Sequence, residues 1–403
     1  MTNSVSSSNY YKNTIAAFFS GVGGIELGFE QTGEFRVVYA NEIDKNAQIT
    51  YNENHLEVKL DKRDIHDVSE NDVPDSDIIV GGFPCQAFSI AGYRKGFEDH
   101  RGNLFFELLR LINAKKPRAI FVENVKNMVT HDHGNTFKII REALTMHGYH
   151  IKWKVMNGKD FGNVPQNRER IYLVGFKSKE AFDKFDFPSP IKLTKSLKDV
   201  IDFSTKVNEL YYYRKNKQPF YEQLSSEMID KNKVYQWRRK YVRENKSGVI
   251  PTLTANMGTG GHNVPLILTD DGIRKLTPRE TFNAQGFPTS FKLPEGISNG
   301  QLYKQAGNSV IVPVIKRIAE NISTALKNAT DSLFHYESSS KYSIVHTTMN
   351  GKFDGESYIV NRFNNKQLLD EFISQNKINF ISPEHYLKVI KNNKRIEFYS
   401  CES

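Results

Sequence analysis

The chain of 403 residues is poor in cysteine, with only Cys85 and Cys401. Two cysteines cannot build a disulfide framework, and they exclude a zinc site made from cysteine ligands. No apolar run approaches the roughly 18 residues that a membrane span needs. Residues 1–13 are polar and serine-rich, unlike the apolar core of a secretory signal. We therefore expect a cytoplasmic protein without a membrane span, and no metal site.

Positive charge is unevenly distributed along the chain. There are 55 Lys+Arg against 46 Asp+Glu, which gives a formal net charge of +9. Residues 205–246 contain eleven Lys+Arg against five Asp+Glu, together with many aromatic residues. A solvated linker or a small β domain could have this composition, but interleaved bases and aromatics favour a nucleic-acid surface. Its candidate nucleic-acid contacts are Arg238, Arg239 and Arg243.

Strand-like and helix-like segments alternate over the first 180 residues. Apolar, β-rich runs at residues 14–19, 36–40, 77–82, 119–123 and 170–176 predict buried strands. Helical periodicity occupies residues 24–31, 44–52, 103–115 and 136–147. This order predicts an α/β fold with a doubly wound, mostly parallel sheet, which binds its ligands at the carboxyl ends of the strands.

A glycine-rich turn follows the first predicted strand. Residues 19–24 read FSGVGG and lead directly into a helix, so backbone N–H groups can approach a ligand there. Glu42 ends the second predicted strand, where an acid can bind ribose hydroxyls, and with Asp64 it suits a nucleoside. A purely structural turn is an equally good interpretation of the glycines alone.

Two reactive side chains follow the next strands. Cys85 lies in GFPCQ, after the third predicted strand, where it could act as a nucleophile or simply as a small buried apolar residue. Glu123 closes the run AIFVE, and partial burial there would raise its pKa so that it could donate a proton. A surface or capping acid is the ordinary alternative for a glutamate.

The sequence QNRER at residues 166–170 opens another strand. Gln166, Arg168 and Arg170 would share one face of this strand, where guanidinium groups could hold an acid or the edge of a base. A structural salt bridge is the alternative.

Taken together, these motifs strongly resemble those of the bacterial DNA (cytosine-5)-methyltransferases. The resemblance runs in the family's order from about residue 14 to residue 326. It comprises FSGVGG (19–24), NEID (41–44), PCQAFS (84–89), GFED (96–99), ENV (123–125), QNRER (166–170), RE (279–280), QGFP (285–288) and QAGNSV (305–310).

The resemblance implies a catalytic mechanism for these residues. The Cys85 thiolate would add to C6 of cytosine, so that C5 can take the methyl group of S-adenosyl-L-methionine. Glu123 would bond or protonate the ring at N3. Arg168 and Arg170 match the pair that orients the base and the glutamate, with Arg170 at O2. The base that removes the C5 proton is not identified.

A site for S-adenosyl-L-methionine is implied in the same way. It would hold Glu42 on the ribose and Asp64 with Ile65 on the adenine, in a Rossmann-like methyltransferase fold. The remaining members would be Phe19, Gly21, Gly24, Pro84, Asn308 and Ser309.

The implied substrate is double-stranded DNA. A cytosine stacked in a duplex cannot reach a thiol, so it would be flipped out, with Gln86, Ser89 and Thr252 contacting DNA near it. The family further implies a monomer in the bacterial cytoplasm, associated with the nucleoid, that protects host DNA from a partner restriction endonuclease. Ala91 departs from relatives that carry a gap-filling side chain at this position.

We expect five segments: a flexible N-terminus (1–13), a catalytic and cofactor-binding domain (14–187), a mainly β or irregular target-recognition domain (188–272), a return segment (273–330) and an extension (331–403). The extension has no place in the family pattern, and peripheral packing, DNA contacts and a partner surface all remain open for it.

RNA cytosine-5 methylation and non-catalytic DNA binding are the alternative functions of the whole chain. The presence of Cys85 and Glu123 argues against non-catalytic DNA binding.

Overall fold

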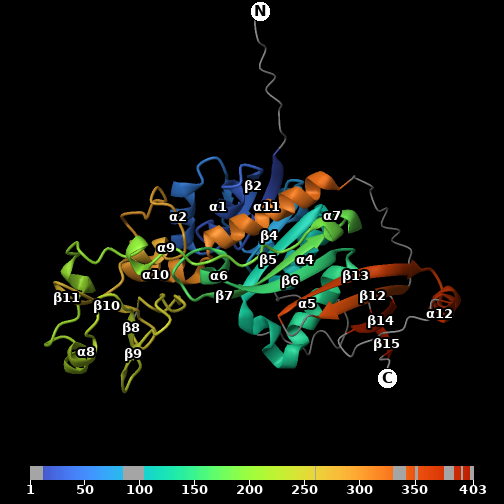
Figure 1. Ribbon diagram of the computed structural model, residues 1–403. Helices are drawn as coiled ribbons and strands as arrows, with labels where there is room; N and C mark the ends of the chain where they lie inside the picture. Colours follow the sequence, from blue (N-terminus) through green and yellow to red (C-terminus); the bar gives the residue numbers. More distant parts are fainter. Residues whose placement is uncertain are drawn as a thin grey trace, which may run out of the picture.

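A computed structural model describes residues 12–84, 104–258, 260–329, 342–349, 353–375, 385–391 and 394–399. An eleven-stranded sheet crosses the molecule, and a separate four-stranded sheet lies at one end (Figure 1). The strands of the large sheet are β1 (Asn13–Phe18), β2 (Phe35–Asn41), β3 (Leu60–Asp61), β4 (Ile78–Gly81), β5 (Ala119–Val125), β6 (His150–Asn157), β7 (Glu169–Phe176), β12 (Tyr342–Met349), β13 (Asp354–Phe363), β14 (His385–Lys391) and β15 (Lys394–Tyr399).

The order of the large sheet is β15-β14-β12-β13-β6-β7-β5-β4-β1-β2-β3. Pairings among β1 to β5 are all parallel, whereas β7 and β6 run antiparallel to their neighbours. Four of the six pairings among β1 to β7 are therefore parallel, and the doubly wound α/β class is confirmed. Because the parallel strands run in one direction, the carboxyl ends of β1, β2, β4 and β5 meet at one edge of the sheet.

Helices cover both faces of this sheet, which explains why its central strands are continuous apolar runs. Helices α1, α7 and α11 pack on one face, and helices α4 and α5 pack on the other. The helices are α1 (Gly24–Glu30), α2 (Lys45–Asn54), α4 (Leu104–Lys115), α5 (Asn135–Met146), α6 (Gly158–Phe161), α7 (Lys179–Lys184), α8 (Tyr221–Glu227), α9 (Pro278–Asn283), α10 (Asn299–Asn308), α11 (Val312–Asn328) and α12 (Lys366–Gln375).

The smaller sheet is antiparallel and follows the order β11-β10-β8-β9. Its strands are β8 (Tyr235–Trp237), β9 (Val242–Glu244), β10 (Leu266–Thr269) and β11 (Gly272–Lys275). Most aromatic residues of this region are packed inward: Tyr235 is buried, and the rings of Phe220 and Trp237 stack with centroids 4.8 Å apart. Tyr235 and the partly buried rings that pack against it form a small core, whereas Tyr241 is exposed, and the nucleic-acid surface expected from these aromatics stays a prediction.

The C-terminal extension continues the large sheet beyond β6. Residues 354–357 of β13 pair antiparallel with β6, and β12, β14 and β15 follow outward. Figure 1 shows the extension at the end of the molecule opposite to the four-stranded sheet. None of the helices in the described part of the chain has the length and apolarity that a bilayer crossing requires.

Candidate functional site

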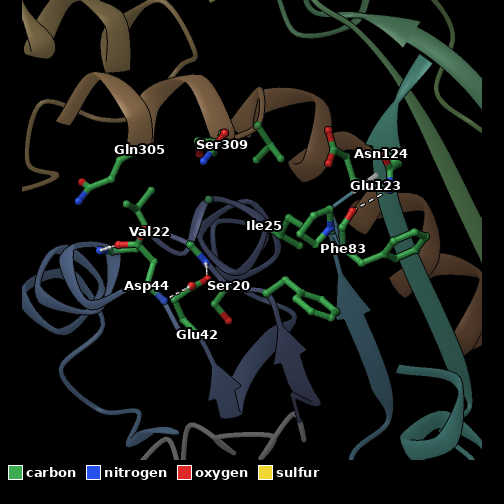
Figure 2. Close-up of a pocket in the computed structure, with 18 of the residues that line it drawn as sticks. Ser20, Val22, Ile25, Glu42, Asp44, Phe83, Glu123, Asn124, Gln305 and Ser309 are labelled. Carbon is green, nitrogen blue, oxygen red and sulfur yellow. Dashed lines mark hydrogen bonds between the residues drawn. The ribbon is translucent and has the colours of Figure 1, made fainter. Parts of the chain in front are cut away.

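A cavity of about 650 Å³ opens at the edge of the sheet where the parallel strands end. Its walls come from the loop after β1, the ends of β2, β4 and β5, the start of β7 and the turn after α10, and Figure 2 shows part of this lining. All nine residues predicted to bind the cofactor line this one cavity, together with three of the four predicted catalytic residues. They are Phe19, Gly21, Gly24, Glu42, Asp64, Ile65, Pro84, Asn308, Ser309, Glu123, Arg168 and Arg170.

The glycine loop and Glu42 form one end of the cavity. Glu42 Oε2 accepts a hydrogen bond from the N–H of Gly21 at 2.7 Å, and Oε1 accepts one from the N–H of Asp44 at 2.7 Å (Figure 2). Burial raises the pKa of Glu42, while these two N–H donors act against that rise. Gly21 has a φ of +57° and Gly23 a φ of +82°, backbone angles that a side chain would strain.

The neighbouring wall combines polar and apolar groups. Asp64 caps a short 3-10 turn by accepting the N–H of His66, and Ile65 is 3% exposed. Ile43 is 58% exposed and also lines the cavity, so it presents apolar surface to a ligand. Sequence reasoning missed Ile43, although it lies inside the NEID motif.

The return segment closes the opposite wall. Asn308 is the last residue of α10 and Ser309 follows it, and Lys304 of this helix forms an ion pair with Asp44 at 2.7 Å. A Cβ on Gly24 would lie 2.7 Å from Ser309 Oγ, so the glycine loop and the return segment touch. Lys304 also lines the cavity and was not predicted, because a lone lysine in a helix carries no distinctive signal.

Glu123 and Arg170 form the other end of the cavity. Glu123 Oε1 lies 3.2 Å from Arg170 Nε, and both side chains are largely buried. Burial raises the pKa of Glu123, and the positive charge of Arg170 opposes that rise. The neighbouring Asn124 donates to the carbonyl of Phe83 at 2.8 Å, which ties the end of β5 to the turn after β4 (Figure 2).

Pro84 is the last described residue of that turn. The predicted nucleophile Cys85 and the predicted DNA contacts Gln86 and Ser89 lie outside the described residues, as does Ala91. In the sequence, Cys85 directly follows Pro84, and Pro84 lines the cavity.

Arg168 is placed differently from Arg170. Its side chain is buried and donates to three backbone carbonyls, those of Leu253, Gly307 and Ser309. It therefore connects three segments of the chain, in addition to lining the cavity.

The predicted DNA contacts of the small sheet gather on one hairpin. Arg239 lies in the turn between β8 and β9 with a φ of +68°, and Arg239 and Arg243 are exposed. Arg238 is only half-buried and bonds to the carbonyl of His262 at 3.3 Å. Thr252 lies apart from this hairpin, and its hydroxyl donates to the carbonyl of Asn167 at 2.6 Å.

Several named proteins are similar in sequence to this chain. The family model of the C-5 cytosine-specific DNA methylases matches residues 14–324. Type II methyltransferase M.Bsp6I of Bacillus sp. (strain RFL6) is 63% identical over 309 residues, which cover 76% of this chain and 98% of that protein. Type II methyltransferase M.HhaI of Haemophilus parahaemolyticus is 39% identical over 316 residues, covering 76% and 93% of the two chains.

Solved structures share the fold. Entamoeba histolytica methyltransferase EhMeth aligns with a TM-score of 0.61 at 18% identity, covering 78% of this chain and 99% of that one. A Spodoptera frugiperda DNMT2 mutant aligns with a TM-score of 0.57 at 20% identity, covering 77% and 99%. With most of its length matched in sequence and its motifs gathered around one cavity, the chain belongs to the C-5 cytosine-specific DNA methylases and is a DNA (cytosine-5)-methyltransferase.

Proposed function

We propose that the cavity binds S-adenosyl-L-methionine, the methyl donor that this family membership implies. The observation that carries the proposal is the convergence of the nine predicted cofactor residues on one cavity that also holds Glu123 and Arg170. A volume of about 650 Å³ is within the range typical of small-molecule sites. The residues present fit a nucleoside, because Glu42 keeps free lone pairs for ribose hydroxyls while Ile43 and Phe19 offer apolar surface for adenine.

The chain's own residues would activate the cytosine. When bound, the donor supplies an electrophilic methyl group. The Cys85 thiolate forms a bond to C6, and Glu123 hydrogen-bonds or protonates N3, which relieves the negative charge that develops on the ring. C5 would then take the methyl group, with S-adenosyl-L-homocysteine as the other product. A base removes the C5 proton, the thiolate leaves from C6, and a proton given to N3 returns to Glu123. Arg170 holds Glu123 in place and is the candidate contact to O2 of the base.

Residues 188–272 are the proposed target-recognition domain. The support is an exposed hairpin that carries Arg239 and Arg243, both without an ion pair to any residue in the described ranges. Duplex DNA would present its phosphates to these cations, and a flipped cytosine would enter the cavity near Glu123. Thr252 could contact DNA only as an acceptor while its proton is donated to Asn167.

The biological role that we propose is host protection against a partner restriction endonuclease. The support is similarity to proteins named Type II methyltransferases. In this role the enzyme acts as a monomer on the DNA of the bacterial nucleoid, in the cytoplasm.

One experiment tests the reaction, the nucleophile and the target together. The wild-type chain, Cys85→Ser and the matched control Cys401→Ser are expressed in a host without cytosine methylation, and the genomic DNA is bisulfite-sequenced. We expect protected cytosines within one short recurring motif for the wild type and Cys401→Ser, and none for Cys85→Ser.

Two outcomes would contradict the proposal. Protection by Cys85→Ser would remove the assigned nucleophile. Soluble wild-type protein that protects no cytosine would overturn methylation of duplex DNA, and transfer of labelled methyl groups to RNA would then identify the alternative substrate.

A further inference from the structure

Two segments that are distant in the sequence run side by side next to the cavity. The N–H of Ile250 donates to the carbonyl of Pro165 at 2.7 Å, and the N–H of Asn167 donates to the carbonyl of Ile250 at 2.8 Å. Thr252 adds its hydroxyl bond to Asn167 at 2.6 Å. The end of the proposed recognition domain is thus hydrogen-bonded to the chain immediately before β7.

Arg168 extends this contact to a third segment. Its Nη1 donates to the carbonyl of Leu253 at 2.9 Å, and its Nη2 donates to the carbonyl of Gly307 at 3.0 Å and to that of Ser309. The residue is 1% exposed, so these bonds are shielded from water. Leu253 follows Thr252 directly, whereas Gly307 and Ser309 line the cavity. One guanidinium group therefore joins the recognition segment to the cofactor wall.

The same two segments also touch without any side chain between them. A Cβ added to Gly307 would lie 2.3 Å from the backbone nitrogen of Ala255 and 2.3 Å from the carbonyl carbon of Thr254. Contact this close leaves no room for a shift of one segment toward the other. A displacement of residues 252–255 must therefore be taken up by residues 307–309, or by breaking the bonds to Arg168.

We propose that Arg168 is a positioning residue that couples DNA binding to cofactor binding. This inference rests on the proposed function, in which residues 188–272 read DNA and residues 307–309 bound the cofactor site. When DNA fixes the recognition segment, Arg168 holds the carbonyls of Gly307 and Ser309 in the arrangement that the cofactor requires. By thermodynamic reciprocity, bound cofactor tightens DNA binding by the same factor.

Lysine is an informative replacement at this position. It keeps the positive charge, but a single ammonium group on a flexible stem cannot reproduce the planar fork that donates to three carbonyls from two nitrogens. The variant Arg168→Lys therefore removes the connection while retaining the charge near Glu123. A structural arginine elsewhere provides a matched control: Arg317 of α11 donates to the carbonyls of Phe161 and Ser189, away from the cavity.

The test measures the coupling factor and not the activity. The Kd of S-adenosylhomocysteine is determined by calorimetry with and without saturating sheared duplex DNA from a methylation-free host, and the ratio of the two Kd values is compared between variants. For the wild type and Arg317→Lys we expect DNA to tighten binding at least about 5-fold, the lower end of ordinary allosteric coupling. For Arg168→Lys we expect a ratio below about 2, whatever its absolute affinities.

Each outcome decides the question. An undiminished ratio in Arg168→Lys, or a ratio near 1 in the wild type, overturns the inference while leaving the proposed function intact. Wild-type protein that binds neither S-adenosylhomocysteine nor DNA overturns the proposed function itself. If Arg168→Lys does not fold, Thr252→Val removes one bond of the same connection with little change in shape, and its ratio must fall below that of the wild type.

Discussion

Glu123 is the residue at which burial and charge act most directly against each other. Burial favours the protonated carboxyl, and the guanidinium of Arg170 at 3.2 Å favours the carboxylate. Since the net result is a raised pKa, Glu123 retains the proton that the proposed mechanism places at N3 to a higher pH than an ordinary glutamate does. We expect Glu123→Gln to lower kcat by about 100- to 10,000-fold, the usual contribution of a general acid.

The pH profile separates this role from a structural one. Wild-type kcat should fall as the pH rises through the raised pKa of Glu123, whereas the residual rate of Glu123→Gln should lack that limb. Methyl transfer to duplex DNA at a series of pH values measures both. Glu169→Gln is the control, because Glu169 is an exposed acid paired with Lys126 outside the cavity lining. A wild-type profile retained by Glu123→Gln would contradict the assignment.

Glu26 is a buried acid that takes no part in the proposed chemistry and lowers the stability of the fold when it ionises. It is 1% exposed on α1, neither carboxylate oxygen has a hydrogen-bond partner in the described ranges, and burial raises its pKa to about 6. Because folding raises the pKa of Glu26, the folded state is favoured by the protonated form of this carboxyl, and this contribution to stability is complete below about pH 4.5. The contribution is lost as the pH rises through about 6 and the buried carboxyl ionises.

We therefore expect Glu26→Gln to increase the free energy of unfolding at pH 7.5 by as much as about 2 kcal/mol, from 1.36 kcal/mol per pKa unit. The increase should disappear toward pH 4.5. Urea denaturation at both pH values measures it, and Glu320→Gln, an exposed acid on α11, serves as the control. An equal effect at the two pH values would show that the ionisation of Glu26 is not the cause.

At the scale of the element, the β8–β9 hairpin combines charge with a tight turn. The N–H of Arg238 donates to the carbonyl of Tyr241 at 2.9 Å, which leaves Arg239 and Lys240 exposed at the tip. We expect Lys240→Ala to weaken binding to all duplex sequences alike, and to reduce the slope of log K against log salt by about 0.9, one phosphate contact.

Fluorescence anisotropy with labelled duplexes at several salt concentrations measures this slope. Lys231→Ala is the matched control in the turn before β8, because Lys231 already forms an ion pair with Asp270. A slope unchanged in Lys240→Ala, or lowered equally in both variants, would place the DNA elsewhere.

Strands that are buried on both faces of the sheet are readily predicted from the sequence. Strands β4 and β5 are continuous apolar runs because helices cover both faces, so they were predicted to within two residues. Strand β6 was missed because Lys152 and Lys154 interrupt its apolar pattern; these lysines pair with Asp186 and Asp354. Those partners come from distant segments, which local patterning cannot show.

The candidate site was more predictable than the elements around it. Motifs name residues directly, and all nine cofactor candidates line one cavity. Helix α10, which carries Lys304 to this cavity, was not predicted because its sequence NGQLYKQAGN is mostly polar. The small core around Tyr235 could not be read from the interleaved aromatics, since composition does not distinguish a small core from a surface.

At the scale of the whole molecule, the extension distinguishes this chain from its relatives. The family match ends at residue 324, and M.Bsp6I is covered over 98% of its length by only 76% of this chain. The methylase fold is therefore complete without the extension, which adds strands to the outer edge at β6. Trp153 of β6 is fully buried, and a Cβ on Gly355 of β13 would lie 2.5 Å from its ring.

These facts predict that a chain ending at Ala329 still methylates DNA but is less stable. Removal of β13 exposes the edge of β6 and uncovers Trp153, at about 1.5–3 kcal/mol for each large side chain returned to water. Urea unfolding followed by tryptophan fluorescence should give a lower midpoint and a red-shifted native spectrum. In the full-length chain, Gly355→Val should shift the midpoint in the same direction, because its side chain would collide with Trp153 and with the carbonyl oxygen of Thr348.

Two results would contradict this prediction. An unchanged midpoint and spectrum on truncation would mean that the extension does not cover β6 in solution. Loss of methylation by a truncated chain that remains folded would mean that the extension takes part in the reaction.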